Sequence, residues 1–156
     1  MDTEFDFLAP GDKPALVAFT NYEWLASVQS ILSVLEYKVH VAGDHSEFLQ
    51  RFNAVQYQIL VMDECFASKS PAENQSLQTL QRMAMAQRRH TTTLLVGANF
   101  QTLHPWQAYA NSVHAVVNQL DLPSLGQIIR MVNQDNGIFL SAYREVQQRI
   151  LRGEVR

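Results

Sequence analysis

The chain has 156 residues, of which 47% are hydrophobic and 17% charged, and its formal net charge is −3. This balance excludes a disordered chain, and the lack of a basic excess argues against nucleic acid as the main partner. The single cysteine, Cys65, excludes an internal disulfide framework. The chain has no apolar run of membrane-spanning length, and its acidic first residues lack the basic region of a signal peptide. We therefore expect a cytoplasmic protein that makes no membrane contact.

Apolar runs and helical spacings alternate along the chain. Runs at residues 15–19, 38–42, 59–62, 92–96 and 115–117 predict five strands. The second run alternates with polar residues, which suits the edge of a sheet. Helical patterns cover residues 25–35, 48–55, 73–89, 106–110 and 125–132, and a last one carries Phe139, Tyr143, Val146 and Ile150.

Helix start signals precede several of these patterns. Thr20 or Asn21 can cap the first helix, and the segment from Asp44 to Glu47 has the spacing of a capping box. Pro105 is placed at the first turn of a short helix, and Pro123 opens the next one.

Five strands alternating with helices predict an α/β fold, with a parallel sheet covered by helices on both faces. In such sheets the functional crevice lies beyond the carboxyl ends of the strands. The residues predicted at those ends are Phe19, Thr20, Asp63, Gly97 and Asn118.

The five βα units, their total length and Asp63 at the end of the third strand resemble the receiver domain of bacterial response regulators, over about residues 14–133. The resemblance implies a flavodoxin-like three-layer α/β/α fold with strand order 2-1-3-4-5, and a place in bacterial two-component signal transduction. We divide the chain into an N-terminal arm (1–13), a receiver-like domain (14–135) and a C-terminal helical extension (136–156).

In the receiver family, two acidic residues ending the first strand bind Mg²⁺ together with a phosphoacceptor Asp. A Thr or Ser, a Lys-Pro pair and a switch aromatic complete the machinery. Position by position, the phosphoacceptor falls on Asp63, the acidic pair on Phe19 and Thr20, the Thr/Ser on Gly97, the Lys-Pro pair on Asn118 and Gln119, and the aromatic on Ala115. The resemblance therefore implies that Asp63 alone is retained.

Phosphoryl transfer needs cations that neutralise the oxygens of the moving group, and Mg²⁺ needs a shell of oxygen ligands. Asp63 beside Phe19 is a poor metal site. Our hypothesis is a non-enzymatic pseudo-receiver, a signalling or scaffolding domain that binds proteins without aspartyl phosphorylation and without metal or cofactor. One alternative is an atypical phosphoacceptor that uses Asp63 with Glu23 or Glu64. Another is a flavodoxin-like module that binds a small ligand in the same crevice.

Other chemistry-bearing residues favour simple interpretations. No cationic run adjoins Cys65, which predicts an ordinary loop thiol. The five histidines have no metal-binding spacing. The loop after the first strand, from Thr20 to Glu23, contains no glycine to cradle a phosphate. For Asp63 itself, we expect hydrogen bonds to Thr20, Asn118 or loop amides.

Two features predict protein partners. By resemblance, Trp106, Tyr109 and Ala115 fall on the face that receivers use for partners and dimers, although Trp106 packing on the sheet is an equal alternative. The apolar stripe of the last helix consists of Phe139, Tyr143, Val146 and Ile150. That stripe must be buried against the domain, a second copy of the chain, or an absent output domain.

Overall fold

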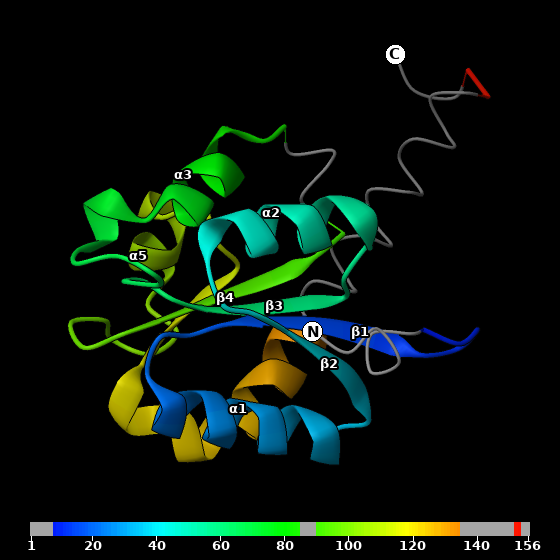
Figure 1. Cartoon of the computed structure of the whole chain (residues 1–156), viewed down its shortest axis with the longest axis horizontal. Coiled ribbons are helices and arrows are strands. Elements are labelled where there is room, and N and C mark those ends of the chain that lie inside the picture. Colours follow the sequence, from blue (N-terminus) through cyan, green and yellow to red (C-terminus); the bar gives the residue numbers. More distant parts are fainter. Residues whose placement is uncertain (1–7, 85–89, 135–151, 154–156) are drawn as a thin grey trace.

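A computed structural model describes residues 8–84, 90–134 and 152–153 of the chain. Figure 1 shows a twisted central sheet with helices above and below it. The elements follow one another as β1 (Lys13–Ala18), α1 (Tyr22–Val34), β2 (Tyr37–Ala42), α2 (His45–Ala54), β3 (Ile59–Asp63), η2 (Pro71–Glu73), α3 (Gln75–Arg82), β4 (Thr92–Gly97), α5 (Pro105–Ala110), β5 (Ala115–Asn118) and η3 (Gln119–Ser124), and a helix covers residues 125–134.

The five strands form one parallel sheet in the order β2-β1-β3-β4-β5, which confirms the predicted α/β fold and its strand order. Ala15 lies beside Val39 on one side and Ile59 on the other, and Asp63 lies beside Val96. The strand β2 is at the edge of the sheet, as its alternating pattern predicts. This register brings the carboxyl ends of the strands to one edge of the sheet.

Alternating residues of each strand face opposite layers. Ala15, Val17 and Phe19 pack in a cluster with α1 and the helix at 125–134, whereas Leu16 and Ala18 pack in a second cluster with α2, α3 and α5. Figure 1 shows the same division, with α1 below the sheet and α2, α3 and α5 above it. The fold thus has the three layers that the sequence predicts.

The predicted helix caps are present. The Asn21 side chain accepts hydrogen bonds from the amides of Glu23 and Trp24 at the start of α1. At the start of α2, Asp44 Oδ1 accepts from the Glu47 amide at 2.7 Å, and the Glu47 carboxylate accepts from the amide of Gly43. These bonds satisfy amides that the first turn of a helix leaves without partners.

The predicted helix over residues 73–89 is wrong in its bounds. A 3₁₀ turn covers Pro71–Glu73, α3 runs only from Gln75 to Arg82, and Met83 is extended with ψ of 146°. The physical reason is packing: Met83 leaves the helical path and its side chain is partly buried against the cluster that includes α2 and α3. Residues 85–89 lie outside the described residues.

The predicted start at Pro123 also differs, because Pro123 lies inside η3 and α-helical geometry begins at residue 125. The stripe of Phe139, Tyr143, Val146 and Ile150 lies outside the described residues. Within the described part of the chain, no helix has the length and apolar character of a membrane span.

Candidate functional site

Asp63 ends β3 at the edge where the strands' carboxyl ends meet, and its side chain is only 7% exposed. Its Oδ1 accepts a hydrogen bond from the Cys65 amide at 3.0 Å, so the prediction of a loop amide as its partner is confirmed. Burial raises the pKa of Asp63 above its ordinary value, and the bond from Cys65 opposes part of that rise. Asp63 is thus a carboxyl held by its own loop.

Glu64 lies directly over Gly97. A Cβ atom built on Gly97 would be 2.5 Å from the Cδ of Glu64, so no side chain fits there while the glutamate keeps its position. Burial raises the pKa of Glu64, and the neighbouring charge of Asp63 raises it further. The space beside the end of β4 is therefore filled by the carboxyl group of Glu64, the residue that follows β3.

The end of β1 contributes no carboxylate. The Phe19 side chain is 5% exposed and belongs to the cluster that contains α1. The next residue, Thr20, is exposed, and its Oγ1 accepts a hydrogen bond from the amide of Ala67 at 2.9 Å. Thr20 thus anchors the loop after β3 and does not contact Asp63 through a hydrogen bond.

Asn118, at the end of β5, holds two loops together. Its Nδ2 donates to Phe100 O at 2.8 Å and to Ala98 O at 3.3 Å, which fixes the loop after β4. Its Oδ1 accepts from the Leu120 amide and caps η3. The position that the receiver resemblance gives to a lysine is therefore occupied by a neutral amide with structural partners.

Two further residues position the loop after β3, and the sequence analysis did not identify them. The buried Asn74 donates from Nδ2 to Glu64 O at 3.1 Å and accepts from the Leu77 amide at its Oδ1. His45 contacts Ser76 through Nδ1 and Ala67 O through Nε2. Asn74 directly precedes a helical pattern, which is a cap signal, but no sequence signal marks its bond to Glu64.

Cys65 has the environment of an unreactive thiol. Burial raises its pKa, and the charges of Asp63 and Glu64 raise it further, so the thiolate is disfavoured. This agrees with the prediction of an ordinary loop thiol.

Receiver folds imply a bound Mg²⁺ ion, and the donor set here does not fit one. Mg²⁺ prefers an octahedral shell of oxygen ligands. The carboxyl groups beside each other are those of Asp63 and Glu64, the latter is packed over Gly97, and β1 ends in the ring of Phe19. Among the described residues, no group of three His, Cys, Asp or Glu side chains is placed to hold a metal ion.

Four exposed hydrophobic side chains, which we call the aromatic surface, come from α5 (Trp106 and Tyr109), the loop before α5 (Leu103) and η3 (Leu120). The side chains of Trp106 and Tyr109 are 73% and 79% exposed, and their rings meet edge to face at 6.2 Å. The alternative that Trp106 packs on the sheet is therefore wrong. From His90 to Leu120 the sequence contains no Asp, Glu, Lys or Arg.

Ala115 does not belong to this surface. Its side chain is 3% exposed and packs in the cluster beneath the sheet, so its predicted role as an interface residue is wrong. The physical reason is its position at the start of β5, where its side chain points into the layer of α1.

No family model and no curated protein sequence matches the chain. Solved structures do match. The chain is similar to a signal receiver domain of an HD-domain-containing protein from Pseudomonas fluorescens, with 16% identity and a TM-score of 0.63, over 86% of this chain and 96% of that one. It is also similar to the chemotaxis response regulator CheY4 of Vibrio cholerae, with 14% identity and a TM-score of 0.62, over 78% and 98%.

A further similar structure is described as a pilus assembly-related protein from Burkholderia pseudomallei, with 19% identity and a TM-score of 0.58, over 82% of this chain and 94% of that one. At these identities the comparisons concern the fold. The chain has the flavodoxin-like fold of response-regulator receiver domains.

Proposed function

We propose that this chain is a pseudo-receiver, a non-enzymatic signalling or scaffolding domain that acts through protein–protein contacts without phosphorylation of Asp63. The observation that carries the proposal is the end of β1, where the buried ring of Phe19 takes the place that receivers give to metal-binding carboxylates. With Asn118 in place of the lysine, a phosphate dianion on Asp63 would lie beside Glu64 without the family's counter-charges.

The proposed loss of switching has a second support. In receivers, a Thr or Ser at the end of the fourth strand responds to the modified aspartate. Here Gly97 has no hydroxyl, and Glu64 fills the adjacent space. The site therefore lacks both the group that would be drawn inward and the room for it to move.

The test is incubation of the chain with Mg²⁺ and a small phosphodonor, or with beryllofluoride, while amide NMR signals near Asp63 are recorded. A competent receiver serves as the positive control. We expect the signals to stay in place. Saturable, Mg²⁺-dependent shifts that disappear in Asp63→Asn would contradict the proposal and favour the atypical phosphoacceptor.

We further propose that the aromatic surface is the docking site for a protein partner, either a second copy or another protein. Interface centres are depleted in charge and enriched in aromatic residues, and this surface has both properties. The predicted C-terminal stripe of Phe139, Tyr143, Val146 and Ile150 is a second candidate contact, toward a partner or an output domain. A cytoplasmic location and a bacterial two-component context remain predictions of the sequence.

The docking surface is tested with the double variant Trp106→Ala/Tyr109→Ala. Both side chains are exposed, so we expect the variant to fold with unchanged stability and to lose partner binding in pull-downs and sedimentation. The matched control is Tyr22→Ala, which removes another exposed ring at the start of α1. Equal loss of binding in both variants would contradict a specific role for the surface.

A further inference from the structure

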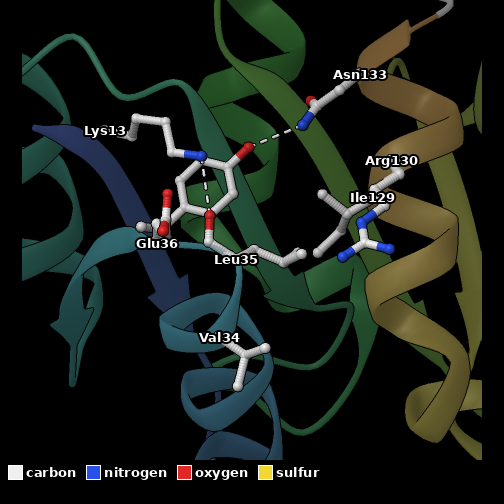
Figure 2. Close-up of a pocket in the computed structure, with 8 residues that line it drawn as sticks. Lys13, Val34, Leu35, Glu36, Ile129, Arg130 and Asn133 are labelled. Atoms are coloured by element: carbon white, nitrogen blue, oxygen red, sulfur yellow. Dashed lines mark hydrogen bonds between the residues drawn. The ribbon is translucent and has the colours of Figure 1, made fainter.

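A groove runs between α1 and the helix at 125–134, and one end of it lies at the amino edge of the sheet. A cavity of about 320 Å³ at that end is shown in Figure 2 and is lined by Lys13, Val34, Leu35, Glu36, Tyr37, Ile129, Arg130 and Asn133. A second cavity of about 320 Å³ continues along the two helices and shares Val34, Leu35 and Arg130 with the first. We call the two cavities together the α1 groove.

Apolar side chains and two cations line the α1 groove. Val34 is exposed and Ile31 and Leu35 are partly buried along it. The ammonium of Lys13 donates to Leu35 O at 2.9 Å and lies 4.4 Å from the centre of the Tyr37 ring, so it is held in place with N–H donors to spare. Asn133 Nδ2 donates to the Tyr37 hydroxyl at 2.8 Å and fixes the opposite wall, as Figure 2 shows.

The walls of the α1 groove carry more positive than negative charge, since Lys13 and Arg130 line it together with one carboxylate. Among the described residues, no carboxylate lies within ion-pair distance of Lys13 or Arg130. That carboxylate belongs to Glu36, which lines the same cavity as Lys13 and Arg130. In a chain of net charge −3, a groove lined by two cations and by apolar side chains fits an acidic segment that also carries apolar side chains.

The chain itself contains such a segment. Residues 1–7, which lie outside the described residues, read MDTEFDF and combine three carboxylates with two phenylalanines. The chain then reverses direction in a tight turn, in which the Asp12 amide donates to Ala9 O at 3.1 Å and Gly11 has a φ of +91°. This turn immediately precedes Lys13, which lines the groove.

The reach of residues 1–7 is compatible with the length of the α1 groove. Seven extended residues reach about 23 Å, and the eight helical steps from Leu125 to Asn133 along the groove correspond to about 12 Å. We propose that residues 1–7 bind in the α1 groove, with their carboxylates toward Lys13 and Arg130 and the rings of Phe5 and Phe7 on Val34 and Leu35. This inference goes beyond the proposed function, since it concerns neither Asp63 nor the aromatic surface.

The test is paramagnetic relaxation on the full chain, with a nitroxide on Thr3→Cys in a Cys65→Ser background. We expect loss of amide signal intensity at Val34, Glu36 and Arg130. The same label on Ser46→Cys, in α2 on the other face of the sheet, should leave those amides unchanged. Uniform broadening, or none at the groove, would overturn the proposal.

Two further experiments test whether binding depends on the charge of the groove and whether it occurs within one chain. Arg130→Gln should restore the groove signals of the Thr3-labelled chain, whereas Arg82→Gln, which removes an exposed arginine from α3, should not. Equal effects of the two variants would reject a role for groove charge. When spin-labelled chain is mixed with isotope-labelled chain that has no spin label, broadening at the groove would mean binding to a second copy and would overturn the intramolecular assignment.

Discussion

Asp63 and Glu64 are adjacent residues whose carboxyl groups share one partly buried site. Burial raises the pKa of both groups, and the charge of Asp63 contributes to the rise at Glu64. A raised pKa means that the folded state holds its proton more tightly than the unfolded chain does. The charged pair therefore lowers the stability of the fold at neutral pH. The chain keeps both carboxyl groups at the end of β3, whereas the ends of β1 and β5 carry the neutral residues Phe19 and Asn118.

The sign of the pH dependence follows from these shifts. The two groups contribute stability that is fully present below their ordinary pKa values of 3.8 and 4.5 and is lost as the pH rises through the higher folded values. Asp63→Asn keeps an oxygen for the Cys65 amide and removes the charge. We expect it to raise the free energy of unfolding at pH 7, with a gain that shrinks toward pH 4, in urea denaturation at both pH values.

The same variant makes a second prediction at this scale. Without the charge of Asp63, the pKa of Glu64 should fall toward its ordinary value, and the part due to burial should remain. The measurement is a carbon-13 NMR titration of the Glu64 carboxyl, with exposed Glu73 as the internal control. An unchanged pKa at Glu64 would show that the two carboxyl groups do not interact.

The Glu64 side chain occupies the space that a side chain at position 97 would need, so the two positions constrain each other. Gly97→Ala places a methyl group against the Glu64 carboxyl, and overpacking of this kind costs about 1–3 kcal/mol. Because the obstacle is a flexible side chain, we expect the lower end of that range. The double variant Gly97→Ala/Glu64→Ala should regain the loss in urea denaturation. Additive effects of the two substitutions would mean that the contact is not the cause.

Among the elements, the loop between β3 and α3 is the one on which the site depends. Two side chains from other parts of the chain hold it, since Thr20 accepts from the amide of Ala67 and His45 contacts Ala67 O, and Asn74 at the end of the loop donates to Glu64 O. Because these hydrogen bonds hold the loop in place, they favour a single conformation of Asp63. This agrees with a domain that acts through a fixed shape.

Asn74→Ala tests how much the hydrogen bonds of Asn74 contribute to the free energy of unfolding. The substitution removes the cap of α3 and leaves buried carbonyl oxygens without their donor, which together should cost about 2 kcal/mol of unfolding free energy. Asn53→Ala, at an exposed position near the end of α2, is the matched control and should stay within about 0.5 kcal/mol of the wild type. Equal losses would mean that Asn74 has no special role.

For the whole molecule, the order of the strands determines which parts open most readily. β1, β3 and β4 are paired on both sides and almost entirely buried, whereas β2 is an edge strand. We expect amide hydrogen exchange to be slowest in the three inner strands and faster in β2, because edge residues can exchange by local opening. Equal protection of β2 and β3 would contradict this.

The molecule also separates its surfaces. The Asp63 site is at the carboxyl edge of the sheet, the aromatic surface is on α5 and the adjoining loops, and the α1 groove opens at the amino edge. Substitutions at one surface can therefore be used as controls for another. The failure of one proposal would leave the others open to test.

The sequence by itself determined the strands, the helices and their layered arrangement, because hydrophobic periodicity and cap residues such as Asn21 and Asp44 are local signals. The order of the strands was predicted from the resemblance to receiver domains, since local signals do not specify it. It also located Asp63 and the loss of acidic residues at the end of β1. Only the tertiary structure decided that Glu64 fills the space over Gly97, that α3 stops at Arg82, and that Ala115 is buried while Trp106 is exposed. These outcomes depend on which side chains meet across layers, and residue spacing along one strand or helix carries no information about the partner that packs against it.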